Sequence, residues 1–89
     1  MVSAEVTIRN RLGMHARAAA IFVRQTTNYD GEVWLTKGKN RVNGKSIMGI
    51  LTLAAARGEM VLIEVEGPGE EETLRTLVDI VDGRFGEVD

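Results

Sequence analysis

Apolar and polar side chains alternate without a break at the start of the chain, where every second residue from Val2 to Ile8 is apolar. A period of two residues predicts a β-strand with one buried face, here over residues 2–9. Further segments rich in β-branched and apolar residues stand between turn-forming residues and are also predicted to be strands. They cover residues 32–36, 41–43 and 60–66.

Other segments carry apolar residues at helical spacing. After residue 16 they lie at positions i, i+3, i+4 and i+7, and a run of alanines favours the helix. Glu70, Glu71 and Glu72 precede a second such pattern, where carboxylates suit the positive end of the helix dipole. Ser46 stands directly before a third apolar run and is a good N-cap. The predicted helices cover about 16–27, 47–54 and 70–83.

The predicted order is strand, helix, strand, strand, helix, strand, helix, with no linker or internal repeat. Strands that alternate cleanly have one wet face, so the helices are expected to cover only the other face. This pattern predicts an α+β fold: a two-layer open-faced sandwich with a four-stranded, mostly antiparallel sheet and three helices on one side. Residues 1–89 are expected to form a single domain.

Composition narrows the possible functions. The 89 residues include no cysteine and one histidine, which excludes disulfides and any zinc site built from several of these residues in one chain. The net charge of −2 offers no basic field for nucleic acid. The apolar runs fall short of a bilayer span, and no signal-peptide pattern is present. We therefore expect a cytoplasmic protein with no cofactor, no metal and no membrane insertion.

The candidate chemistry lies at the junction between the first strand and the first helix. His15, the only histidine, stands there with Arg17 two residues later. A neutral imidazole is a nucleophile, and the free N–H groups of Ala16 and Arg17 at the helix start can donate to a phosphoryl group on it. The Arg17 guanidinium can add charge-assisted hydrogen bonds. The alternatives are a histidine without chemical function and a non-covalent clamp for an anionic ligand.

The segment after Ser46 holds more apolar residues than one face of a short helix can bury. Ile50 and Leu53 are the expected core residues, and some of the others must be exposed. An exposed apolar patch on a small protein usually marks a partner site. The N-cap role alone is sufficient to explain Ser46.

Two motifs and the length of the chain resemble the HPr family, the histidine-containing phosphocarriers of the bacterial sugar phosphotransferase system. Residues 12–19 (LGMHARAA) are similar to its active-site signature, and residues 42–49 (VNGKSIMG) to its regulatory serine motif. The resemblance implies a phosphocarrier that is not itself an enzyme. Enzyme I, charged by phosphoenolpyruvate, would phosphorylate Nδ1 of His15, and enzyme IIA domains would receive the group.

The resemblance also assigns roles outside the histidine. Ser46 would be phosphorylated by HPr kinase/phosphorylase, and the phosphate would inhibit phosphorylation of His15. The protein is expected to be a monomer that makes weak, brief contacts with its partners. Phe22 or a neighbour could join the docking surface. The partner-facing residues implied by the family are Met14, Ala20, Arg24, Ile47, Met48 and Leu51.

One residue departs from the family pattern. Ala18 follows Arg17 where the family usually has proline, whose fixed φ suits the first turn of a helix. Alanine keeps the helix but makes the loop before it less rigid. Two related alternatives remain open: a nitrogen-type regulatory phosphocarrier, and a catabolite-repression paralogue, although that class lacks the active histidine that this chain has.

Overall fold

A four-stranded antiparallel sheet forms one layer of the protein and three helices form the other. The computed structural model describes residues 1–89. The predicted order of elements is confirmed. The elements are β1 (Val2–Thr7), α1 (Ala16–Thr26), β2 (Glu32–Lys37), β3 (Asn40–Asn43), α2 (Ile47–Thr52), β4 (Met60–Glu66) and α3 (Glu70–Asp82), followed by a 3-10 turn at Arg84–Gly86.

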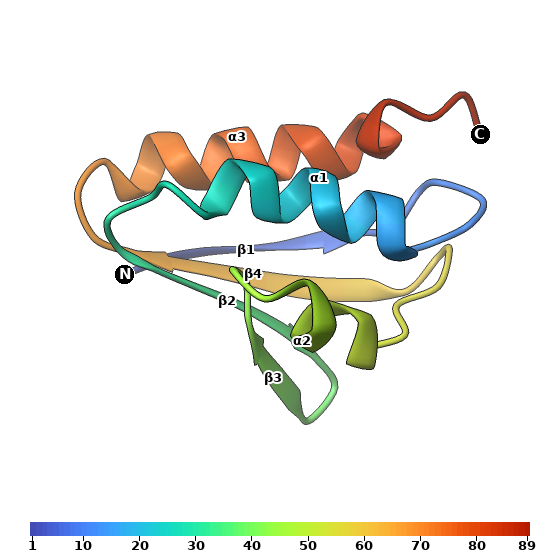
Figure 1. Cartoon of the computed structure of the whole chain (residues 1–89), viewed down its shortest axis with the longest axis horizontal. Coiled ribbons are helices and arrows are strands. Elements are labelled where there is room, and N and C mark those ends of the chain that lie inside the picture. The colour runs from blue at the N-terminus through green and yellow to red at the C-terminus, as the bar shows by residue number, and fades with distance from the viewer.

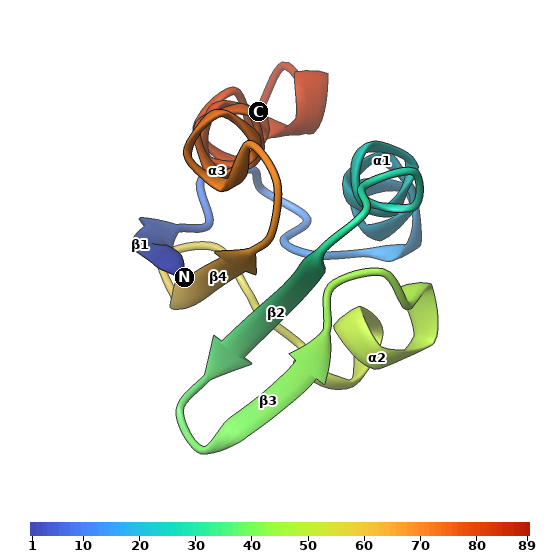
Figure 2. The same cartoon turned by 90° about the vertical axis from the view of Figure 1, so that its left-hand side faces the viewer.

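The strands lie in the order β1-β4-β2-β3, and every neighbouring pair is antiparallel. Val6 pairs with Val61, and Leu35 pairs with Ile63, so apolar residues of adjacent strands share one face. Figures 1 and 2 show all three helices on the same side of the sheet, with α2 beside β3. The predicted open-faced sandwich is therefore confirmed.

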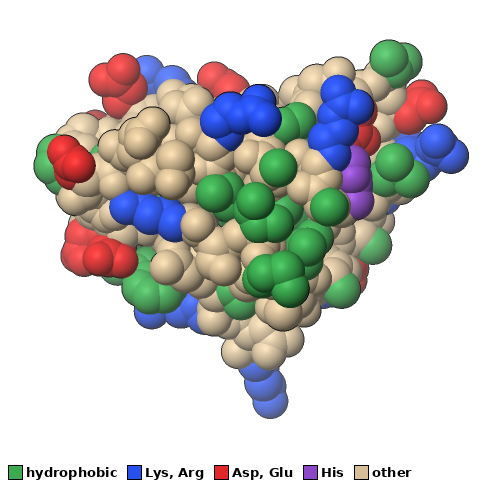
Figure 3. Space-filling view, viewed as in Figure 1, with side chains coloured by type: hydrophobic (Ala, Val, Ile, Leu, Met, Phe, Trp, Pro, Cys, Tyr) green, Lys and Arg blue, Asp and Glu red, His purple; other side chains and the backbone are tan.

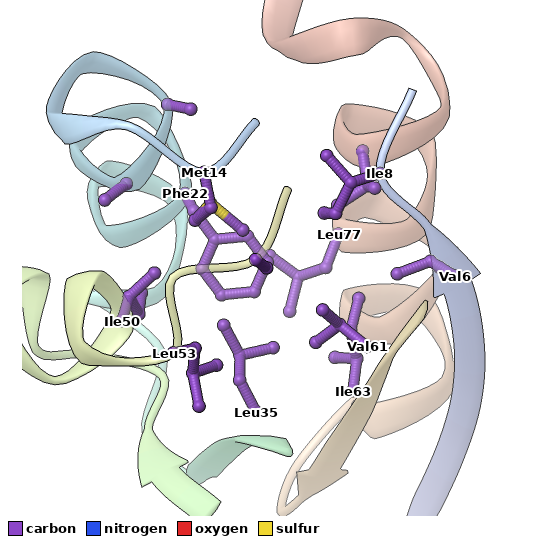
Figure 4. Close-up of a cluster of buried hydrophobic side chains, with 14 of the residues drawn as sticks. Val6, Ile8, Met14, Phe22, Leu35, Ile50, Leu53, Val61, Ile63 and Leu77 are labelled. Atoms are coloured by element: carbon purple, nitrogen blue, oxygen red, sulfur yellow. The ribbon is translucent and has the colours of Figure 1, made fainter. Parts of the chain in front are cut away.

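The core lies between the covered face of the sheet and the helices (Figure 4). Val61, Ile63 and Val65 alternate along β4 and are all buried, as period-two patterning requires. Phe22 of α1 and Leu77 of α3 are fully buried against them. Ile50 of α2 and Leu53, which follows the helix, are also buried, as expected, and they help to attach this segment to the core.

The helix α2 ends earlier than the sequence pattern indicates. The predicted segment runs to residue 54, whereas the helix stops at Thr52. Ala54 has a φ of 49°, in the left-handed region, which no helix can continue through. Lys37 donates from Nζ to the carbonyl oxygens of Leu53 and Ala54, and these bonds satisfy acceptors left free at the helix end.

The residues after α3 form a 3-10 turn that the sequence pattern does not predict. Arg84, Phe85 and Gly86 all have positive φ, so the chain leaves the helical conformation in a tight turn directly after α3. Phe85 is only 5% exposed and belongs to the core cluster. Its burial offsets the strain of the left-handed backbone and fixes the path of residues 87–89.

The structure corrects one expected docking residue. Met14 is 5% exposed and its side chain points into the core, where Phe22 is also fully buried (Figure 4). The backbone N–H of Met14 donates to the carbonyl of Ala55 at 2.9 Å, which holds this loop against the segment after α2. Met14 and Phe22 therefore pack inside the protein and offer almost no exposed surface, contrary to the expectation that they belong to an exposed docking surface.

Candidate functional site

The loop from β1 to α1 carries His15 to the first turn of α1. Gly13 lies in this loop with a φ of +68°, a conformation that favours glycine. A Cβ on Gly13 would lie 2.6 Å from the carbonyl oxygen of Ala55, so no side chain fits there. The close packing of this loop against residue 55 determines where His15 leaves the core.

His15 occupies the N-cap position of α1 with extended backbone angles, φ −80° and ψ 178°. Its side chain makes no cap hydrogen bond to the helix, so the ring remains available for other chemistry. The first N–H groups of the helix, including those of Ala16 and Arg17, have no intrahelical acceptor. No acidic residue occupies the first turn. The predicted juxtaposition of imidazole, free N–H groups and helix N-terminus is present.

Arg17 is exposed and forms no ion pair with a carboxylate. Its guanidinium therefore carries a positive charge that no carboxylate pairs with, two residues after His15 in the chain. A phosphoryl group on the imidazole could accept hydrogen bonds from this fork without breaking an existing contact.

The structure adds Glu87, a residue that the sequence pattern does not single out. Its carboxylate contacts His15 Nε2 through Oε2 at 2.5 Å, and Nδ2 of Asn10 donates to Oε1 at 3.1 Å. Hydrogen bonding to His15 is the largest cause that lowers the pKa of the Glu87 carboxyl, and the Asn10 bond and the nearby Arg17 charge act in the same direction. Glu87 is therefore an ionised partner of the histidine.

No sequence signal could have identified Glu87, because 72 residues separate it from His15. Asn10 is a second residue that sequence reasoning missed. It is fully buried and donates to Gly13 O at 2.7 Å as well as to Glu87, which links the loop before His15 to the end of the chain.

Ser46 caps α2 as predicted. Its Oγ accepts from the backbone N–H of Gly49 at 3.0 Å, and its own backbone is extended. The side chain is partly exposed at the start of the helix. A phosphate on this oxygen would lie at the positive end of a short helix.

The other residues assigned to docking lie at the surface. Met48 is 73% exposed and Ile47 38% exposed, whereas Leu51 is half-buried and packs partly against the core. Ala20 is half-buried on α1, Arg24 is exposed there, and α1 packs against α2. Figure 3 shows hydrophobic side chains gathered over these two helices, with the histidine at the edge of the patch. We call Ala20, Arg24, Ile47, Met48 and Leu51 the docking surface.

Neither hollow in the protein surface brings His15 and Arg17 together. The larger, about 640 Å³, lies at the start of α3 and is lined by three glutamates with Gly69 and Arg75, a setting that repels anions. The smaller, about 180 Å³, lies beside Glu87 and is below the roughly 300 Å³ of typical ligand pockets. No three metal-binding side chains come together, and no helix is long and apolar enough to span a membrane.

The family model described as "PTS HPr component phosphorylation site" matches residues 2–82. The phosphocarrier protein HPr of Neisseria meningitidis is 46% identical over 87 residues, which cover 98% of each chain. A crystal structure of HPr from Thermoanaerobacter tengcongensis is 40% identical, covers 98% of each chain and superposes with a TM-score of 0.93.

Two further similarities bear on the catabolite-repression paralogue and on the expected monomeric state. The HPr-like protein Crh of Halalkalibacterium halodurans is 33% identical over 82 residues, covering 92% of this chain and 98% of its own. A second structure from T. tengcongensis is an HPr dimer, 40% identical over 98% of this chain and 100% of that one, with a TM-score of 0.76. The agreement of fold, motif and full-length identity establishes that this chain belongs to the HPr family, phosphocarriers of the phosphotransferase system that are not themselves enzymes.

Proposed function

We propose that His15 accepts a phosphoryl group from phosphoenolpyruvate-charged Enzyme I and passes it to enzyme IIA domains. One observation carries the proposal: the imidazole stands at the N-terminus of α1, whose first N–H groups are free, two residues before the unpaired Arg17, with Nε2 already bound to Glu87. The nitrogen left for chemistry is Nδ1.

In the transfer, the Nδ1 lone pair forms a bond to phosphorus while the bond between phosphorus and the donor breaks. The electron pair of the broken bond leaves with the donor. The N–H groups of Ala16 and Arg17, together with the Arg17 side chain, stabilise the added negative charge by donating hydrogen bonds to the phosphoryl oxygens. In the onward transfer, a nucleophile of the acceptor bonds to phosphorus while the bond between phosphorus and Nδ1 breaks, and the electron pair returns to Nδ1.

Partners would bind over the docking surface defined above. Its exposed methionine adapts to surfaces of different shape, which suits a carrier that meets a donor and several acceptors. Arg17 and Arg24 indicate that these partners present acidic groups. Because contacts must be brief, we expect a small, weak interface made by a monomeric protein in the cytoplasm.

The test is labelling of the purified protein with Enzyme I and phosphoenolpyruvate, followed by mass spectrometry. The wild type should gain one acid-labile phosphoryl group and lose it to an enzyme IIA domain. His15→Ala should gain none, whereas Ser46→Ala should be labelled normally. Undiminished labelling of His15→Ala would remove the proposal, and binding of phosphate without covalent labelling would favour the anion clamp.

We further propose that phosphorylation of Ser46 by HPr kinase/phosphorylase inhibits the reaction at His15. The support is positional, since Ser46 immediately precedes Ile47 and Met48 of the docking surface. A phosphate there suits the helix N-terminus, so the fold is retained, but it adds negative charge where an acidic partner must bind.

Ser46→Asp, which keeps an N-cap residue, should therefore slow phosphorylation by Enzyme I about tenfold, a penalty of the size expected for opposed charges at an interface. Ser3→Asp places the same charge at an exposed site on β1 and is the matched control. Equal Enzyme I kinetics for Ser46→Asp and Ser3→Asp would contradict the regulatory role.

A further inference from the structure

The end of the chain is attached at several points around His15. Phe85 is buried in the core, and the backbone N–H of Arg11 donates to the carbonyl of Asp89 at 2.9 Å. Between these two anchors, Glu87 contacts both His15 and the fully buried Asn10. Figure 1 shows the C-terminus beside the loop that follows β1. The position of the Glu87 carboxylate is thus set by packing and hydrogen bonds on both sides.

The carboxylate determines where the imidazole carries its hydrogen. An ionised carboxylate only accepts hydrogen bonds, so Nε2 of His15 must be the donor in this pair. A neutral ring with its hydrogen on Nε2 has its lone pair on Nδ1. The same arrangement, in which a carboxylate orients a histidine through the far nitrogen, is used by general-base and metal-binding histidines.

We propose that Glu87 is a positioning residue for phosphoryl transfer: it holds the Nε2–H tautomer of His15 and stabilises the positive charge that the ring gains. This inference rests on the proposed role of His15. It concerns the state of the ring before transfer, which can be measured without any partner.

The charge balance explains why the carboxylate helps. When Nδ1 bonds to phosphorus and the donor leaves with its electron pair, the hydrogen stays on Nε2. The ring then carries one positive charge, and the carboxylate of Glu87 faces it through the existing hydrogen bond. Arg17 lies close enough for its charge to lower the Glu87 pKa, and it is placed to balance the negative charges of carboxylate and phosphoryl group.

The test compares Glu87→Gln and Glu87→Ala with the wild type by ¹⁵N NMR of the histidine ring and by phosphorylation kinetics. The wild type should show a solvent-protected Nε2–H signal at a pH where imidazoles are neutral. The amide of Glu87→Gln can still accept from Asn10 but lacks the charge, so it separates electrostatics from packing. Each variant should lose the protected signal and be phosphorylated by Enzyme I about tenfold more slowly, the effect expected for one charge-assisted hydrogen bond.

Glu87→Asp should recover part of the rate. Asp89→Asn removes a neighbouring carboxylate that pairs with Arg11 and does not touch His15, so it should behave as the wild type. A hydrogen on Nδ1 in the wild type, or wild-type kinetics in both Glu87→Gln and Glu87→Ala, would overturn the inference. Failure of the wild type to be phosphorylated at His15, with the Nε2–H signal intact, would instead contradict the proposed function.

Discussion

At the scale of single residues, the two nitrogens of the His15 ring have different surroundings and different proposed roles. Nε2 faces Glu87, and Nδ1 is left for the phosphoryl group and the donors around it. Glu87 supplies a negative charge on the Nε2 side of the ring, and Arg17 supplies a positive charge close enough to lower the Glu87 pKa. In the mechanism that we propose, this arrangement stabilises the phosphorylated ring and still lets the group leave, because Arg17 is at the exposed surface.

Replacing Arg17 tests whether its side chain stabilises the phosphoryl group. Arg17→Ala should lower the rate of phosphoryl transfer about ten- to hundredfold, since hydrogen bonds to charged groups are lost. The free energy of unfolding should change by less than about 0.5 kcal/mol, because the side chain is exposed and unpaired.

Stopped-flow or quench-flow transfer assays and urea denaturation measure these two quantities for Arg17→Ala. Arg75→Ala on the exposed surface of α3 is the control and should change neither. An unaltered transfer rate for Arg17→Ala would argue against the phosphate-binding role.

At the scale of elements, apolar spacing together with turn and cap residues was sufficient to predict the four strands and three α-helices, because the longer elements bury one face and the spacing indicates which one. Loop residues have no periodic spacing that would indicate which side chains are buried. Met14 precedes α1 outside any periodic pattern, and only the packing of its loop against Ala55 shows that it is buried. Glu87 could not be placed for the same reason, because its position depends on the turn at Phe85.

Gly13 tests how strongly this loop positions the site. Gly13→Ala should destabilise the fold by more than about 2 kcal/mol, because the left-handed backbone costs about 1 kcal/mol and the new Cβ would collide with the Ala55 carbonyl. It should also slow phosphoryl transfer, since His15 lies two residues away.

Gly38 provides a matched control for this variant. It also has a positive φ, +60°, but a Cβ added to it would meet no atom within 4 Å, so Gly38→Ala should cost only about 1 kcal/mol and leave transfer unchanged. Chemical denaturation measures both variants. Equal losses would show that the contact with Ala55 does not constrain the loop.

At the scale of the whole molecule, the residues that stabilise the open-faced sandwich lie apart from the exposed residues that we propose as the docking surface. The core lies between the sheet and the helices, while α1 and α2 present the histidine and the docking surface on one side (Figure 3). Partner-facing residues can therefore vary with little effect on the fold. The excess of apolar residues in α2 predicts that some of them are exposed, but only the three-dimensional packing shows which ones, namely Ile47 and Met48.

Met48 tests this separation. Met48→Ala should weaken binding to Enzyme I or an enzyme IIA domain about fivefold, the loss of roughly 1 kcal/mol at an interface, and change stability by less than about 0.5 kcal/mol. Met60→Ala removes another exposed methionine, 51% exposed on β4, and should leave binding unchanged. Isothermal titration calorimetry would contradict the docking surface if both variants bound like the wild type.

The most direct test of the central claim is the identity of the phosphorylated nitrogen. Protein labelled with ¹⁵N in its single histidine can be phosphorylated by Enzyme I and phosphoenolpyruvate and studied by ³¹P and ¹⁵N NMR. We expect phosphorus to be coupled to Nδ1 of His15, with the hydrogen retained on Nε2 facing Glu87. Phosphorus bonded to Nε2, or a phosphoryl group that is not on His15, would contradict this claim.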